Sequence, residues 1–115
     1  MEEFDIAIIG GGPAGIMAAI AASADLNIVL LEKNSSLGSK LLITGGGRCN
    51  ITNEKPIKKL LNSFHDKNFL KHSFYTFTNE MLLDLFRNRG LDFIVEANNR
   101  VFPETEKSQD ILAIL

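Results

Sequence analysis

A glycine-rich turn near the start of the chain has the residue types that bind a dinucleotide pyrophosphate. Gly10, Gly12 and Gly15 form a G-x-G-x-x-G pattern directly after the apolar run at 6–9. In this pattern the first glycine permits a sharp turn, the second leaves room for phosphate oxygens, and the third lets a helix lie close to the strand. The N–H groups at the helix N-terminus then face the anion, and proline fits that first turn. The predicted pyrophosphate-binding residues are Gly10, Gly12, Pro13, Ala14 and Gly15.

An acidic residue follows at the spacing expected for a ribose ligand. An alanine-rich run at 14–24 predicts a helix, and the apolar run at 28–31 predicts a second strand that ends on Glu32. Glu32 lies 17 positions beyond Gly15, close to the spacing of about 20 at which a carboxylate binds ribose hydroxyls. The order of these features predicts a βαβ unit over residues 4–32. An ordinary βαβ turn with an incidental surface acid is the alternative.

A second polar, glycine-rich stretch, residues 33–53, has the composition of a cofactor loop. Its glycine N–H groups could approach a phosphate or a flat ring closely, and its Lys and Arg side chains could neutralise a pyrophosphate. A long loop without any ligand is the alternative. The expected cofactor-binding residues here are Lys33, Lys40, Thr44, Gly45, Gly46, Gly47, Arg48, Cys49 and Asn50.

Several stretches of the chain resemble one family. They are I-G-G-G-P-A-G-I-M-A-A at 9–19, L-E-K-N at 31–34, the run at 37–53, and N-R-V-F-P at 99–103 with the Lys-Ser pair at 107–108. The G-G-G-R-C-N part is the most specific. On these residues the chain resembles the BaiN-like, or aminoacetone-oxidase-type, family of bacterial FAD-dependent oxidoreductases.

The resemblance implies a fold and a cofactor. The fold is α/β, a Rossmann-like, doubly wound FAD-binding domain of the glutathione-reductase type. The FAD pyrophosphate would lie at 10–15 and the adenosine ribose on Glu32, with 40–50 lining the path toward the flavin. Family members are several times longer, and this chain has only two of the three parallel strands of one nucleotide-binding half. We therefore expect residues 1–115 to be the N-terminal part of an incomplete domain that alone binds FAD weakly or not at all.

The second half of the chain predicts short helices over 56–90, a hairpin over 92–102 and a helix over 108–115 that ends after about two turns. The hairpin turn falls on Asn98 and Asn99, which tolerate the left-handed backbone region. An aromatic cluster (Phe69, Phe74, Tyr75 and Phe77) lies beside lysines. We expect it to form a packed hydrophobic face, with base stacking on single-stranded nucleic acid as the alternative.

Composition limits the partners. The net charge is −2 and 45% of the residues are hydrophobic, so the chain gives no indication of a nucleic-acid partner. Neither a secretory signal nor a membrane span is expected, because the first residues are acidic and glycines interrupt the apolar run. Cys49 is the single cysteine, which fits a reducing, cytoplasmic location. No residues have the spacing of a metal site.

The leading hypothesis is the FAD-binding segment of a flavin-dependent oxidoreductase whose substrate is a small molecule, with NAD(P)H as a candidate electron donor. The rest of the same longer protein would complete the site. The alternatives are the NAD-binding domain of a dehydrogenase and a non-catalytic module that retains the fold. Cys49 has no C-x-x-C partner, so we expect no disulfide-reductase chemistry. We expect Cys49 to be simply a small residue packed beneath the cofactor loop. No catalytic acid or base can be named.

Overall fold

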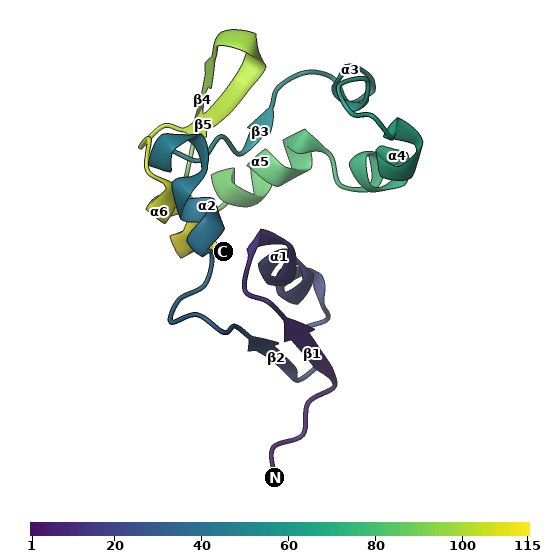
Figure 1. Cartoon of the computed structure of the whole chain (residues 1–115), viewed down its shortest axis with the longest axis vertical. Coiled ribbons are helices and arrows are strands. Elements are labelled where there is room, and N and C mark those ends of the chain that lie inside the picture. Colours follow the sequence, from purple (N-terminus) through teal and green to yellow (C-terminus); the bar gives the residue numbers. More distant parts are fainter.

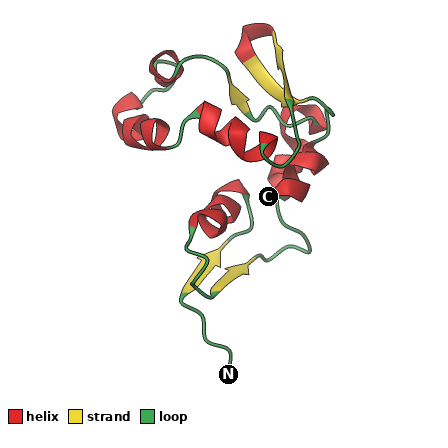
Figure 2. Cartoon of the chain, turned by 180° about the vertical axis from the view of Figure 1, so that it is seen from behind, coloured by secondary structure: helices red, strands yellow, loops and turns green.

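The computed structural model describes all 115 residues, which extend over 52 × 33 × 26 Å. A small α/β layer lies at one end, and a larger part made of short helices and a second sheet lies at the other (Figure 1). A long connection leads from the first part into the second (Figure 2). No helix has both the length and the apolar character needed to cross a membrane.

The α/β layer is the predicted βαβ unit. Strands β1 (Ile6–Ile9) and β2 (Ile28–Leu31) pair in parallel, with Ile6 opposite Ile28 and Ile9 opposite Leu31, and α1 (Pro13–Ala21) connects them. The helix is three residues shorter than the expected run to Ala24, because Ala22 is already extended. The chain must turn back there, since the Asn27 N–H donates to the Asp5 carboxylate at 2.8 Å.

The segment 33–53, expected to be a loop, contains regular structure. It includes α2 (Ser39–Ile43), the 3-10 turn η1 (Thr44–Gly47) and the two-residue strand β3 (Thr52–Asn53). Helix α2 packs on α6 (Ser108–Ile114), where the buried Ser108 hydroxyl donates to the Leu42 carbonyl at 2.8 Å. Of the apolar run at 41–43, Leu41 is buried in a cluster with Ile111 of α6, whereas Ile43 stays exposed.

Three helices follow, within the range where short helices were predicted. They are α3 (Ile57–Leu61), α4 (Lys67–Thr76) and α5 (Asn79–Arg87). Asp66 caps α4 by accepting from the Phe69 N–H at 3.1 Å, and Thr78 caps α5 by accepting from the Met81 N–H at 3.2 Å. These caps satisfy N–H groups that a helix cannot pair internally.

The expected hairpin is confirmed. Strands β4 (Phe93–Glu96) and β5 (Arg100–Pro103) are antiparallel, and β3 pairs with the other edge of β5. The turn η2 (Ala97–Asn99) includes Asn98 and Asn99 at φ of 64° and 59°, in the left-handed region that asparagine tolerates. β3 was not predicted, because two residues are too few to show an alternating pattern.

A cluster of buried apolar residues lies in the larger part of the chain and contains Leu41, Cys49, Phe86, Leu91 and Ile111. Helix α4 does not contribute to it and has no buried residue. The expected packed aromatic face is therefore wrong for Phe69, Tyr75 and Phe77, which are 79%, 53% and 40% exposed. Phe74 does pack, with its ring 5.3 Å from that of Phe64.

Candidate cofactor site

The first glycine turn has the geometry that its sequence pattern predicts. Gly10 has a φ of +102°, and its N–H donates to the Leu31 carbonyl at 2.8 Å. A Cβ at Gly15 would collide with the carbonyl oxygen of Gly10. The first glycine therefore makes the turn, and the third lets α1 approach the strand.

The N-terminus of α1 is open to an anion. Gly12 is the N-cap, with no side-chain cap, and the first helical hydrogen bond runs from Ile16 N–H to Gly12 C=O at 3.0 Å. The N–H groups of Ala14 and Gly15 thus have no partner within the helix. No atom lies within 4 Å of a Cβ built on Gly12. A phosphate can approach these N–H groups, and the helix dipole favours its charge.

Glu32 lies beside this turn and accepts hydrogen bonds from backbone groups. One carboxylate oxygen accepts from the Gly11 N–H at 2.8 Å, and the other accepts from the Asn34 N–H at 2.8 Å and its side-chain amide at 2.7 Å. The N–H groups of Asn34 and Gly11 lower the pKa of Glu32 below its ordinary value. Glu32 is therefore ionised at neutral pH, the state that accepts hydrogen bonds from ribose hydroxyls.

The glycine turn is joined directly to the segment that follows Glu32. The Gly38 N–H donates to the Gly11 carbonyl at 2.8 Å. A Cβ on Gly11 would overlap the side chain of Leu37, which packs over it. The two glycine-rich segments of the sequence therefore meet at Gly11.

A cavity of about 450 Å³ separates α1 from the larger part of the chain. Of the predicted cofactor residues it brings together Pro13 and Ala14 from the first segment with Lys40, Thr44, Cys49 and Asn50 from the second. Its volume and its mainly apolar lining suit a cofactor with a flat ring and a few polar groups. Lys40 forms no ion pair within the chain, so its charge is available to an anion.

The sequence did not predict most of the apolar lining, which comprises Met17, Leu41, Ile51, Leu82, Phe86, Ile111 and Leu115. The apolar stripes at 81–86 and 108–115 were expected to face inward. These stripes could not show that their inward side would also border a cavity, because the cavity depends on the position of α1, which belongs to the α/β layer at the other end of the molecule.

The glycine run at 45–47 makes a left-handed turn, with φ of 57°, 67° and 87° in order. A Cβ on Gly45 would lie 2.6 Å from the Asn50 nitrogen, whereas the corresponding position on Gly46 is open. Gly45 is therefore required by packing. Gly46 is the residue whose backbone a ligand could approach.

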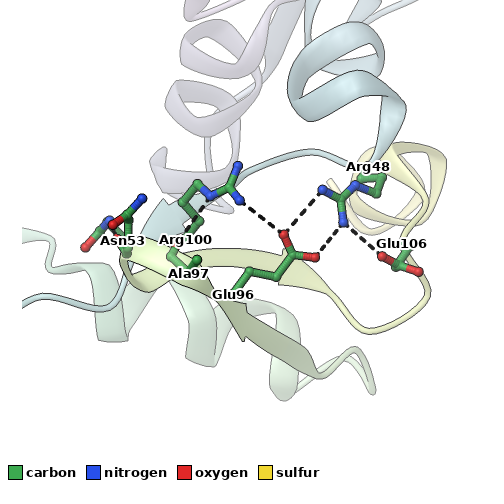
Figure 3. A network of polar contacts seen from close by, with 7 residues as sticks. Arg48, Asn53, Glu96, Ala97, Arg100 and Glu106 are labelled. Atoms are coloured by element: carbon green, nitrogen blue, oxygen red, sulfur yellow. Dashed lines mark hydrogen bonds and ion pairs between the residues drawn. The ribbon is translucent and has the colours of Figure 1, made fainter.

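Arg48 does not face the cavity and is held by acidic residues (Figure 3). Its guanidinium lies 2.6 Å from a carboxylate oxygen of Glu96 and 2.9 Å from one of Glu106. Hydrogen bonding to Glu96, and then to Glu106, raises the pKa of Arg48, and the same contact with Arg48 lowers the pKa of Glu96. Arg100 also reaches Glu96, at 3.5 Å. The charge expected to neutralise a pyrophosphate is thus already paired inside the chain.

Cys49 lines the cavity but is only 4% exposed. Burial raises the pKa of its thiol, so the thiol stays protonated and weakly nucleophilic at neutral pH. Its φ of 61° is unusual for a residue other than glycine, and its N–H donates to the Thr44 carbonyl at 3.0 Å. Besides Arg48, the predicted residues that do not line the cavity are Gly10, Gly12, Gly15, Glu32, Lys33, Gly45, Gly46 and Gly47.

Comparisons with known proteins agree with this architecture. The HI0933-like protein Rossmann domain matches residues 4–115. A 3-dehydro-bile acid delta(4,6)-reductase of Clostridium scindens is 34% identical over 96% of this chain and 27% of its own length. A ribosomal RNA dihydrouridine synthase of Escherichia coli is 33% identical over 100% of this chain and 28% of its own length.

A shorter match is a mitochondrial dihydrolipoyl dehydrogenase of Caenorhabditis elegans, 39% identical over 64% of this chain and 13% of its own length. The chain spans little more than a quarter of the two fuller relatives. The match to the family model covers both glycine segments, Glu32 and the hairpin. The chain therefore belongs to the HI0933-like Rossmann family, the BaiN-like group of FAD-dependent oxidoreductases.

Proposed function

We propose that these residues bind the dinucleotide part of FAD in a flavin-dependent oxidoreductase. The observation that carries the proposal is the cavity, because it brings the open N-terminus of α1 and the second glycine segment to one place. When bound, FAD supplies an isoalloxazine ring that accepts and donates hydride. The residues of this chain bind and orient the cofactor.

Each part of the site has a distinct role in this proposal. The N–H groups of Ala14 and Gly15 bind the pyrophosphate, Gly12 leaves room for it, and Glu32 accepts hydrogen bonds from the adenosine ribose. Lys40 replaces Arg48 as the neutralising cation, since Arg48 is paired with Glu96 and Glu106. Glu32 would repel a 2′-phosphate, so NADP is disfavoured at this position.

The segment 44–50 contributes three residues to the wall of the cavity. Thr44, Cys49 and Asn50 line it directly, and Gly46 exposes its backbone. We assign this segment to the path toward the flavin ring. Lys33, Gly45, Gly47 and Arg48 shape or surround the site without lining the cavity.

For the whole protein we propose the reduction of an unsaturated substrate, with NAD(P)H as electron donor, in the reducing cytoplasm. The names of two relatives, a delta(4,6)-reductase and a dihydrouridine synthase, both describe the addition of hydrogen. In this reaction one hydride and one proton add across a carbon–carbon double bond while NAD(P)H is oxidised. The relatives differ in substrate, so they support the reaction type and not one compound.

The test is the cofactor content of the purified protein that carries these residues. A yellow preparation absorbing near ~450 nm, with one FAD released per chain on denaturation, is the expected result. Anaerobic addition of NAD(P)H should then remove the absorption. A colourless protein that binds NAD tightly would support the dehydrogenase alternative, and bound FAD that no reductant bleaches would support a non-catalytic module.

We assign Cys49 a packing role. Because it is buried and its thiol is protonated, Cys49→Ser should leave flavin binding and turnover nearly unchanged. Loss of turnover with the flavin still bound would show that the thiol takes part in the reaction.

A further inference from the structure

The positive charge of this chain is concentrated in one region. Residues 55–77 contain five lysines and one acid, a net charge of +4, whereas the other residues carry seven basic and thirteen acidic side chains, a net charge of −6. The overall value of −2, from which no nucleic-acid partner was expected, averages two regions of opposite sign. A concentrated positive charge attracts polyanions even when the whole molecule is acidic.

These lysines are not neutralised within the chain. Every ion pair in the structure uses Arg48, Arg87 or Arg100. The one acid of the region, Asp66, accepts a hydrogen bond from the Phe69 N–H at the start of α4. All five lysines therefore remain free to meet an external anion.

Three of the five lysines line a groove. A hollow of about 350 Å³ between α3 and α4 is bordered by Lys58, Lys67, Lys71, Asn62, Asn68 and Tyr75, and by no acid. Lys67, Lys71 and Tyr75 follow one another at intervals of four and so share one face of α4. A shallower hollow beside it shares Asn68, Lys71 and Tyr75 and adds His72. The two hollows form a continuous cationic surface.

Exposed aromatic rings accompany the lysines. Tyr75 in the groove is 53% exposed and Phe69 on the same helix is 79% exposed. Lysines that follow a phosphate backbone, with rings on which bases stack, are the combination that binds single-stranded nucleic acid. A membrane-surface helix instead needs its apolar face free. In α4, Phe74 packs on Phe64, so its apolar ring is not free to enter a membrane.

We propose that the groove between α3 and α4 binds single-stranded RNA. The three groove lysines contact phosphates, Tyr75 stacks on a base, and the amides of Asn62 and Asn68 hydrogen-bond 2′-hydroxyl groups, which only RNA has. The proposal is independent of the proposed flavin chemistry, because no residue of this groove lines the cofactor cavity.

The test uses the flavin-loaded protein and a fluorescein-labelled 15-nucleotide oligouridylate, with binding followed by anisotropy. We expect a Kd of about 1–100 μM at physiological salt that rises steeply with salt. Replacing Lys58, Lys67 and Lys71 together by Gln should weaken binding at least tenfold and flatten the plot of log K against log salt by about 2, since each phosphate contact contributes about 0.7. Tyr75→Ala should weaken binding about tenfold and leave that slope unchanged.

Lys107→Gln is the matched control, because it removes one exposed lysine outside the groove. It should bind like the parent, while Lys71→Gln alone should bind several-fold more weakly. Retention of FAD absorbance shows that each variant is folded. A triple variant with parental affinity, binding of anionic phosphatidylserine vesicles but not RNA, or equal affinity for oligodeoxythymidylate would each overturn the proposal. Failure of the cofactor assignment appears separately, as missing flavin in the parent protein.

Discussion

The guanidinium carbon of Arg48 lies 4.1 Å from the centroid of the Phe102 ring, while the same guanidinium bridges Glu96 and Glu106. Phe102 is 1% exposed, so Arg48 stacks on a fixed surface. The arginine of the G-G-G-R-C-N run thus ties the cofactor segment to the β4–β5 hairpin. Its position in the sequence had suggested contact with phosphate.

We expect Arg48→Ala to lower the melting temperature and to weaken FAD binding indirectly, because the glycine segment loses its attachment. Arg87→Ala is the matched control, since Arg87 also pairs with two acids, Glu80 and Asp84, but stacks on no ring. Thermal melting with and without FAD measures both effects. If the two variants melted alike, the stacking on Phe102 would contribute nothing.

The glycine turn offers a pair of substitutions with opposite expectations. Gly15→Ala should destabilise the fold by roughly 1–3 kcal/mol, because its Cβ would collide with the Gly10 carbonyl. Gly12→Ala should fold normally, because its Cβ would point into open space, yet lose FAD affinity as the methyl group takes the place of phosphate oxygens.

Urea unfolding and FAD titration separate the two cases. A Gly12→Ala protein that bound FAD as tightly as the parent would place the pyrophosphate elsewhere.

Lys40→Gln should weaken FAD binding roughly tenfold, the effect of losing one charge-assisted hydrogen bond to phosphate. The dependence of affinity on salt should become shallower. Arg48→Gln, although it removes the same charge, should leave that salt dependence unchanged, because Arg48 is already neutralised by acids. If both variants changed the salt dependence of FAD affinity equally, Arg48 would have to be assigned to the phosphate site as well.

The pH dependence of cofactor binding follows from Glu32. The pKa of Glu32 in the folded protein lies below the ordinary value of 4.5. Its contribution to the stability of the folded state is therefore fully present above pH 4.5 and is lost as the pH falls through the lowered value. Because the Glu32 carboxylate also stays ionised over this range, its hydrogen bonds to the ribose should give FAD affinity no pH dependence between pH 8 and about 5.

Glu32→Gln should bind FAD more weakly at every pH and lose the acidic limb of the profile. Stopped-flow or fluorescence titration across the range measures it. An acidic limb that persisted unchanged in Glu32→Gln would assign the titration to another group.

The parts of the fold that local sequence determines could be predicted. The βαβ unit, Glu32 and the hairpin turn at Asn98-Asn99 each depend on a short pattern, because glycine, asparagine and strand residues act on their own backbone. Helix α2 was harder to predict, because a helix of five residues is too short to be stable by itself. Its packing on α6, which includes the hydrogen bond from Ser108 to the Leu42 carbonyl, is a contact with a distant part of the sequence.

The partners of Arg48 show the same limit in the site. Glu96 and Glu106 lie 48 and 58 residues away along the chain. No local pattern connects an arginine with acids so distant, so its charge was assigned to the cofactor. The exposed rings of α4 show a related limit. The spacing of aromatic residues indicates which side of a helix they share, but not whether another element covers that side.

The contact between Gly11 and Leu37 has a consequence for how the motif is recognised. In G-x-G-x-x-G the second position is written as free, and most side chains are compatible with the pattern. Here a Cβ at position 11 would overlap a terminal methyl group of Leu37 and crowd the side chain of Glu32, so Leu37 would have to shift. The position that the motif leaves open is therefore a packed one in this protein, and a substitution there would act on Glu32, the residue assigned to the ribose, and on Leu37 of the following segment.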